Sequence, residues 1–265
     1  MSRLCFVLTA STLKENLKAI SSIGKHLDCA ELRADFLDPE EYRYIRRFPG
    51  LLGIPVILTI RRVKEGGKFS GGESERRELL RRGLHGKYSY VDIEEDVEDR
   101  LLEETAALRK VKIIRSFHEY NGVPCDLARR MQSLVRKPGE IPKAAVYPRT
   151  TGEFLHIITA SRELAGFEKI LLGMGPVGFP TRILAAHLGS FLSYCSQPSR
   201  QAAPGLIDPD TLIEVYRFKT IRENTKIFGI IGNPVFHSLS PRIHNTGFKR
   251  LNLNAVYLPF QTDNL

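Results

Sequence analysis

Tryptophan is absent from this chain of 265 residues, and cysteine and methionine are scarce, with four and three copies. The cysteines, at positions 5, 29, 125 and 195, lie far apart and form no C-x-x-C pair, which predicts neither a zinc ribbon nor a disulfide framework. The seven histidines include no H-E-x-x-H motif, and we expect no metal site. This cysteine usage is typical of a reducing compartment, so we expect a cytoplasmic protein.

Long hydrophobic runs are also missing. The run from Leu51 to Ile60 is short and is broken by Gly53 and Pro55, whereas a membrane-spanning helix needs about 18 apolar residues or more. Near the N-terminus, Leu4 to Leu13 is followed at once by two charged residues, without the small-residue cleavage site of a signal peptide. We therefore expect neither a membrane partner nor a leader.

Acidic residues are fewer than basic ones, 30 against 39, which gives a formal net charge of +9. The densest charge cluster, Glu73 to Arg82, interleaves both signs at helical spacing, as a solvated helix does, and no RNA-binding or helix-turn-helix signature accompanies it. We expect no nucleic-acid partner. The positive balance suits an anionic small molecule, and a non-enzymatic module that binds an anionic partner stays open as an alternative.

Short β-type runs recur every 25 to 30 residues or so, and each is followed by a helical pattern, which is typical of parallel α/β folds. The predicted strands are 4–9, 30–34, 55–60, 88–93, 111–117, 144–147, 169–172 and, more weakly, 191–195. The predicted helices are 12–26, 39–48, 74–84, 97–110, 125–135, 151–165, 181–188 and 210–216. Eight units predict a (β/α)₈ TIM barrel, although a doubly wound sheet shows the same alternation, so the strand count decides.

After Phe218 the pattern restarts, with a strand over 226–232, a turn-rich loop, a helix over 242–251 and a strand over 255–260. A unit of this length cannot bury its own core well. We therefore expect a barrel domain over 1–220 and a truncated α/β segment over 221–265, the start of a domain that is cut off at Leu265.

Several chemistry-bearing residues fall at the ends of predicted strands, where the active sites of such barrels lie. Lys143 sits between Pro142 and an apolar run, where a neutral amine could attack a carbonyl. Taken alone, the position favours a strand-edge lysine whose stem lies on apolar surface while its head reaches water. His118 is a candidate general acid or base, or a structural hydrogen bonder. Arg33, Arg61 and Arg182 would bring positive charge to one barrel mouth, or form salt bridges.

One motif is typical of a different kind of site, a dinucleotide-binding loop. The stretch from Gly173 to Gly178 formally matches G-x-G-x-x-G between a strand and a helix. The full dinucleotide fingerprint needs an acidic residue about 20 positions on, yet none occurs between Glu168 and Asp208. The sequence therefore does not favour a nucleotide site here.

Several segments of the chain resemble those of a known family. The matching segments are Glu31-Leu-Arg-Ala-Asp35, Thr59-Ile-Arg61, Asp92-Ile-Glu94, Ser116-Phe-His118, Lys143 with the following AAVYP, Met174 to Arg182, and Ala203-Pro-Gly205. Over about 1–215 the chain resembles type I 3-dehydroquinate dehydratase, and over about 226–265 it resembles the N-terminal edge of shikimate dehydrogenase. That order resembles the bifunctional shikimate-pathway enzyme of aromatic amino-acid biosynthesis.

The resemblance implies a lyase that converts 3-dehydroquinate to 3-dehydroshikimate and water through a Schiff base on Lys143. His118 would move the proton and Glu65 would orient this histidine. Arg182 would hold the substrate carboxylate, and Met174 would be a packing wall. Glu31, Arg33 and Arg61 would hold ring hydroxyls. The dehydratase would need no cofactor.

In the second segment, Ser238 and Ser240 match the shikimate-binding loop of the dehydrogenase, although a turn and a helix N-cap explain them as well. The rest of the dehydrogenase, with its NADP domain, would lie farther along, so dehydrogenase activity is not expected of this chain. The full-length protein would also reduce 3-dehydroshikimate to shikimate with NADPH.

The chain departs from the family where Ala202 and Leu206 stand in place of the usual Ser and Gln, so a hydroxyl and an amide that would bond substrate are lost. A Schiff-base aldolase on the same barrel stays open as an alternative. The sequence leaves the oligomeric state open.

Overall fold

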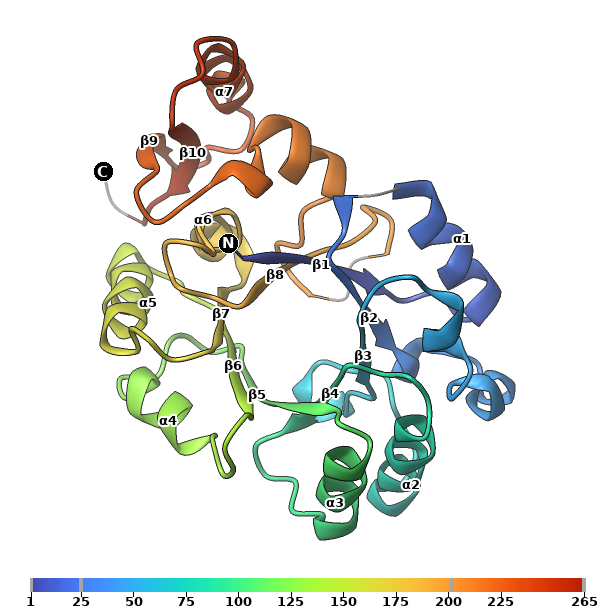
Figure 1. Cartoon of the computed structure of the whole chain (residues 1–265). Helices are drawn as coiled ribbons and strands as arrows, with labels where there is room; N and C mark the ends of the chain where they lie inside the picture. The colour runs from blue at the N-terminus through green and yellow to red at the C-terminus, as the bar shows by residue number, and fades with distance from the viewer. Residues whose placement is uncertain (1, 24–25, 201–202, 264–265) are drawn as a thin grey trace.

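The computed structural model describes residues 2–23, 26–200 and 203–263. Eight parallel strands form one sheet in the order β7-β6-β5-β4-β3-β2-β1-β8. They are β1 (Arg3–Leu8), β2 (Cys29–Arg33), β3 (Val56–Thr59), β4 (Tyr90–Glu94), β5 (Lys112–Glu119), β6 (Ile141–Val146), β7 (Ile170–Gly173) and β8 (Leu192–Cys195). An isolated parallel bridge between Lys169 and Ser190 joins the two edges, so the sheet curls into the predicted barrel (Figure 1).

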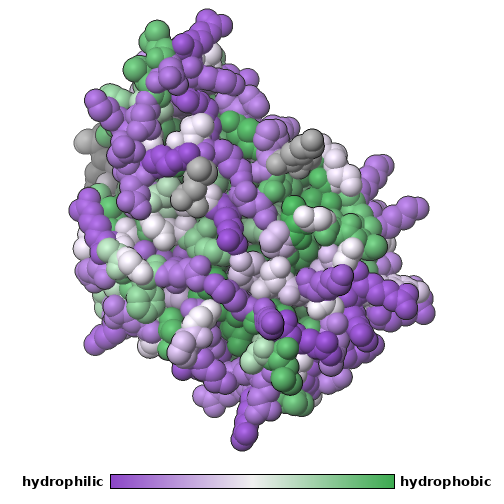
Figure 2. Space-filling model, in the orientation of Figure 1, coloured by the Kyte–Doolittle hydropathy of each residue, from purple (hydrophilic) through white to green (hydrophobic). Residues whose placement is uncertain are grey.

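Helices surround this barrel and cover its outer face (Figure 1). They are α1 (Leu13–Ile23), α2 (Glu73–Leu84), α3 (Arg100–Leu108), α4 (Leu127–Ser133), α5 (Thr151–Glu163) and α6 (Gly175–Ile183). The strands are buried on both faces, which is why each appears in the sequence as a short, nearly continuous apolar run. Figure 2 shows hydrophilic residues over most of the visible surface, with hydrophobic ones between them. None of the helices in the described ranges is both long and apolar enough to cross a membrane.

Three predicted helices differ from the structure. The segment predicted as a helix over 39–48 forms two 3₁₀ pieces, Pro39–Tyr44 and Phe48–Leu51, each with a proline at its start. The helix predicted over 181–188 is α6, which begins six residues earlier, at Gly175, and ends at Ile183. Its Gly-Pro-Val-Gly stretch indicated a loop, but proline is well tolerated in the first helical turn. The predicted helix over 210–216 is a short π-helical turn, Thr211–Val215.

The glycines of the G-x-G-x-x-G stretch have a packing role. A Cβ atom at Gly173 would lie 2.7 Å from the Cα atom of Gly178, so α6 can approach the end of β7 only where both residues lack side chains. Gly175 has a φ of +68°, which a residue with a side chain rarely adopts. Close packing at this strand-to-helix turn therefore explains the motif.

The C-terminal segment contains β9 (Lys226–Gly232), α7 (Ser240–Arg250) and β10 (Ala255–Gln261), with β9 and β10 paired in parallel. Figure 1 shows this unit beside α6. The rings of Phe236 and Phe260 pack edge-on against Phe179 of α6 and Phe154 of α5. Val256 and Leu258 join the same buried cluster as the barrel helices, which explains how so short a unit shares a core that it could not form alone.

Candidate active site

A pocket at the carboxyl ends of the strands gathers most of the predicted site residues. Its lining comprises Val7, Glu31, Arg33, Arg61, His118, Lys143, Ala145, Leu172, Met174, Arg182, Tyr194, Ala203 and Leu206. Register explains why two of them meet, because Ser116 pairs with Lys143 and His118 pairs with Ala145 on adjacent strands β5 and β6. Side chains two positions apart point to the same face of a sheet, so the lysine and the histidine both face the barrel interior.

Lys143 lies inside β6 and is only 4% exposed. Its Nζ atom donates a hydrogen bond to Asp92 Oδ2 at 2.7 Å, and Glu31 Oε1 lies 3.7 Å away. The same Nζ atom stands 4.6 Å from the centre of the Tyr194 ring. The amine is therefore held at the floor of the pocket among acidic and aromatic groups, and it does not extend to solvent.

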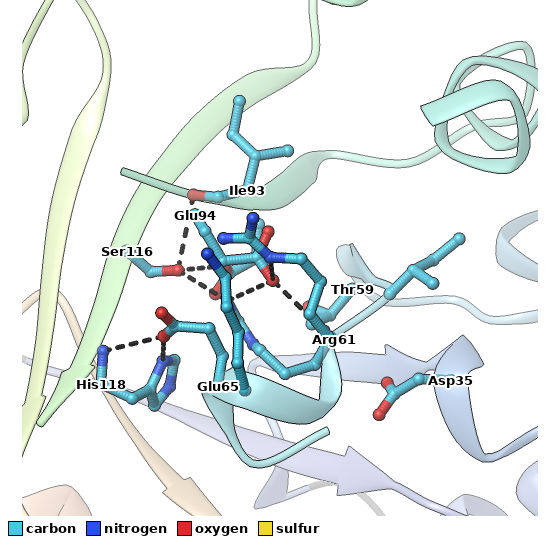
Figure 3. A network of polar contacts seen from close by, with 12 residues as sticks. Asp35, Thr59, Arg61, Glu65, Ile93, Glu94, Ser116 and His118 are labelled. Atoms are coloured by element: carbon cyan, nitrogen blue, oxygen red, sulfur yellow. Dashed lines mark hydrogen bonds and ion pairs between the residues drawn. The ribbon is translucent and has the colours of Figure 1, made fainter. Parts of the chain in front are cut away.

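His118 is held by one carboxylate oxygen. Glu65 Oε2 lies 3.2 Å from the ring Nδ1 atom and also accepts the backbone N–H of His118 at 3.2 Å (Figure 3). Because a carboxylate accepts, Nδ1 must carry the proton, and Nε2 is left with a free electron pair. Burial, together with the positive charges of Arg61 and Lys143, holds the pKa of His118 well below 6.5. The ring is therefore a neutral base at neutral pH.

This electrostatic setting predicts a particular pH dependence. Because the pKa of His118 is depressed, we expect the acid limb of a kcat/KM profile to lie below pH 6.5. The unfolded chain binds a proton at His118 near pH 6.5, whereas the folded chain binds one only at lower pH. As pH falls below 6.5, proton binding to the unfolded chain therefore lowers the free energy of unfolding. A limb centred above pH 6.5 that disappears in His118→Asn would contradict this environment.

Asp92 connects the site residues. The residue is 1% exposed, and its carboxylate accepts hydrogen bonds from Arg61 at 2.6 Å, Ser116 at 2.6 Å and Lys143 at 2.7 Å. Burial alone would raise the pKa of Asp92, but the positive charges of Arg61 and Lys143 outweigh burial and hold this pKa far below its usual range. The carboxylate therefore stays ionised and fixes the amine and the guanidinium relative to each other.

Removing this carboxylate should destabilise the fold. We expect Asp92→Asn to lower the free energy of unfolding by about 3–5 kcal/mol, because Arg61 and Lys143 would remain buried without the carboxylate that lies closest to both of them. The matched control is Asp96→Asn, whose half-exposed carboxylate pairs with Arg62 and Lys64 at the surface and should cost less than about 1 kcal/mol. Urea titrations measure both, and equal losses would contradict the role of Asp92.

The other polar lining residues are paired as well. Arg33 forms a bidentate pair with Asp35, at 2.9 and 2.8 Å, and Glu31 accepts a hydrogen bond from Thr59 at 2.8 Å. Besides Asp92, Arg61 contacts Ser116 and, at 3.3 Å, Glu94 (Figure 3). These bonds fix the directions in which the side chains face the pocket.

Arg182 differs from the other pocket cations. Its side chain, on α6, is 2% exposed, and its Nη2 atom donates to the backbone oxygen of Pro204 at 3.2 Å. Within the described ranges no carboxylate pairs with it, and its Nε atom has no hydrogen-bond partner. Burial lowers the pKa of Arg182 to about 10, so the group is still charged at neutral pH. An unpaired buried cation facing a pocket is suited to bind an anion.

Some of the remaining predicted residues line the pocket and others lie outside it. Met174 is 1% exposed and lines the pocket at the start of α6. Ser238 and Ser240 lie in the C-terminal segment, outside the pocket lining, where the Ser238 hydroxyl accepts the backbone N–H of Ser240 at 3.2 Å. Leu206 lines the pocket, and Ala202 lies outside the described residues. No group of three or more potential metal ligands occurs among the residues described.

Two known protein families match this chain. Residues 4–223 match the model of the type I 3-dehydroquinase family, and residues 230–265 match that of the shikimate dehydrogenase substrate-binding domain. The chain belongs to the type I 3-dehydroquinase family. Its pocket therefore lies in the type of barrel that the family motifs indicated.

Individual relatives agree with this assignment. The chain is 32% identical over 251 residues to the chloroplastic bifunctional 3-dehydroquinate dehydratase/shikimate dehydrogenase of Arabidopsis thaliana, covering 90% of this chain but only 40% of that protein. It is 31% identical over 217 residues to the 3-dehydroquinate dehydratase of Methanocaldococcus jannaschii, covering 77% of this chain and 94% of that one. A solved structure of dehydroquinate dehydratase and shikimate dehydrogenase from S. pombe AroM shares the fold, with a TM-score of 0.71 and 23% sequence identity. The match covers 100% of this chain and 53% of that one.

Proposed function

We propose that this protein is a 3-dehydroquinate dehydratase, which removes water from 3-dehydroquinate to give 3-dehydroshikimate in the shikimate pathway. The observation that carries the proposal is that Lys143, a buried primary amine, and a neutral His118 lie on adjacent strands and line the same pocket. Membership of the type I 3-dehydroquinase family supports the choice of substrate.

The roles of these two residues follow from their chemistry. Lys143 first releases the extra proton of its ammonium form to solvent, and the neutral amine then attacks the ring ketone, whose oxygen leaves as water. The resulting imine withdraws electrons from the neighbouring carbon. His118 takes a proton from that carbon through Nε2, and Glu65 holds the ring in the orientation and tautomer that this requires. The imidazolium then returns the proton to the departing hydroxyl, and hydrolysis of the imine frees the product. One molecule of water is lost overall.

The other lining residues position the substrate. Arg182, the pocket cation without a carboxylate partner among the described residues, binds the substrate carboxylate. Glu31, Arg33 and Arg61, whose directions are fixed by neighbouring polar groups, hold the ring hydroxyls. Met174 packs against the ring as an apolar wall.

The absorbance of the conjugated product tests the reaction directly. Adding 3-dehydroquinate to the purified protein should raise the ultraviolet absorbance steadily, and the substrate alone under the same conditions is the control. A flat trace would overturn the proposed function. If the protein instead cleaved a β-hydroxy ketone into two carbonyl fragments, the site would be a Schiff-base aldolase.

The C-terminal segment belongs to a second activity in this proposal. We place the boundary between the two domains between residues 220 and 221. One family match ends at 223 and the other begins at 230, which supports a boundary in this region. Ser238 and Ser240 would contact shikimate. The dehydratase reaction uses Lys143 in place of a cofactor. NADPH reduction of 3-dehydroshikimate is proposed only for a protein that carries a whole dehydrogenase.

The state of the cysteines bears on the cellular location. All four cysteines are free thiols, and three of them are buried. This arrangement fits a reducing compartment, and we propose that the protein acts in the cytoplasm.

A further inference from the structure

Two buried polar atoms in the pocket have no hydrogen-bond partner among the residues described. One is Nε of Arg182, and the other is the hydroxyl oxygen of Tyr194, a residue that is 4% exposed. Over 90% of buried polar groups in folded proteins are paired, and an unpaired one needs an explanation. Both residues line the same pocket, so a bound ligand is the natural partner for both atoms.

Tyr194 is placed by the barrel itself. It lies on β8, the strand that pairs with β1, and its side chain belongs to the cluster of residues that fills the barrel interior. The face of its ring meets Lys143, whose Nζ atom is 4.6 Å from the ring centre. The tyrosine therefore stands beside the amine that would attack the substrate.

The electrostatics make this hydroxyl a donor. Burial raises the pKa of Tyr194 well above its usual range, and the nearby negative charge of Glu31 raises it further, so the hydroxyl keeps its proton. Arg182 and Tyr194 are close enough to interact electrostatically. An O–H donor near a free guanidinium N–H matches the two oxygens of a carboxylate.

Part of the pocket lining is apolar. Val7, Leu172, Ala203 and Leu206 line the pocket and pack in the same buried cluster as Tyr194. A substrate group that lost water on entering this side of the pocket would need a donor there, and the tyrosine hydroxyl supplies one.

We propose that the Tyr194 hydroxyl and the Arg182 guanidinium together bind the carboxylate of the substrate, which makes Tyr194 a specificity-determining residue. This inference rests on the proposed function, because it takes the substrate to be an anionic ring ketone. Tyr194 does not move protons in the reaction. It selects ring ketones that carry a carboxylate over those that lack one.

The test is Tyr194→Phe, with Tyr90→Phe as the matched control. Tyr90 is a buried tyrosine of the same barrel interior whose hydroxyl accepts a hydrogen bond from Arg3, and it does not line the pocket. We expect Tyr194→Phe to raise KM for 3-dehydroquinate about tenfold, as for loss of a hydrogen bond to a charged group, with little change in kcat. The control should keep the wild-type KM.

Two further readouts separate binding from a structural role. Urea unfolding should show no loss of stability in Tyr194→Phe, because the removed hydroxyl has no partner among the described residues. Borohydride labelling of Lys143 should slow about tenfold in the variant with 3-oxocyclohexanecarboxylate as the probe, and should be unchanged with cyclohexanone, which lacks the carboxylate.

An unchanged KM in Tyr194→Phe overturns the role of Tyr194. A lower urea midpoint in this variant, together with equally slower borohydride labelling for both ketones, also overturns it. These outcomes are distinct from a failure of the proposed function. In that case the wild-type protein itself would not turn over 3-dehydroquinate.

Discussion

The Lys143→Met variant is expected to lose 3-dehydroquinate turnover by about 10³-fold or more, because the reaction then has no covalent electron sink. Methionine has a similar length, so the side chain still fills its place in β6. Asp92 keeps Arg61 and Ser116 as hydrogen-bond donors, and the pocket keeps its shape. Steady-state rates of product absorbance measure the effect.

Lys169→Met is the matched control for this variant. Lys169 is also a buried lysine, 1% exposed, but its amine donates to the backbone oxygen of Leu164 and it does not line the pocket. Burial lowers the pKa of Lys169, which makes this residue the competing candidate for a nucleophilic amine. If Lys169→Met abolished turnover while Lys143→Met retained it, the site would have been assigned to the wrong lysine.

The second large effect concerns His118. We expect His118→Asn to reduce kcat by about 10² to 10⁴-fold, as for loss of a general base, while Lys143 still forms an imine that borohydride can trap. Asparagine keeps a donor toward Glu65 but has no basic electron pair. The combination of lost turnover and retained adduct would locate His118 in the proton transfer.

His156→Asn controls for the loss of an imidazole. His156 lies on α5, where Nε2 contacts the backbone oxygen of Pro124 at 3.0 Å, away from the pocket lining. Its kcat should equal that of the wild type. If His118→Asn lost the trapped adduct together with turnover, His118 would act in imine formation, and its proposed role would be wrong.

The sequence allowed the barrel to be predicted because its strands are buried on both faces and therefore appear as apolar runs separated by helices. Even the weakly predicted eighth strand is present, as β8. Prediction failed at α6, where Gly175 and Pro176 indicated a loop although proline is well tolerated in a first helical turn. The sixth strand begins at Ile141, three residues before the predicted start, which places Lys143 inside the strand.

The candidate site was only partly accessible from sequence. Lys143 was indicated by its place beside an apolar run, and His118 and the arginines by strand ends or loops. The connecting role of Asp92 was not indicated, because it depends on side chains from β5, from β6 and from the loop after β3 converging on one carboxylate. The signal available was a charged residue inside the apolar run of β4. Tyr194 gave no signal, because an aromatic residue in a strand is ordinary and only the structure shows that its hydroxyl is unpaired among the described residues.

The proposed reaction depends on a covalent imine between Lys143 and the substrate. The most direct measurement is peptide mass analysis after the wild-type protein is treated with 3-dehydroquinate and borohydride. We predict that the reduced adduct lies on the peptide containing Lys143 and is absent without substrate. Turnover of 3-dehydroquinate without any adduct, or an adduct on another lysine, would contradict the account.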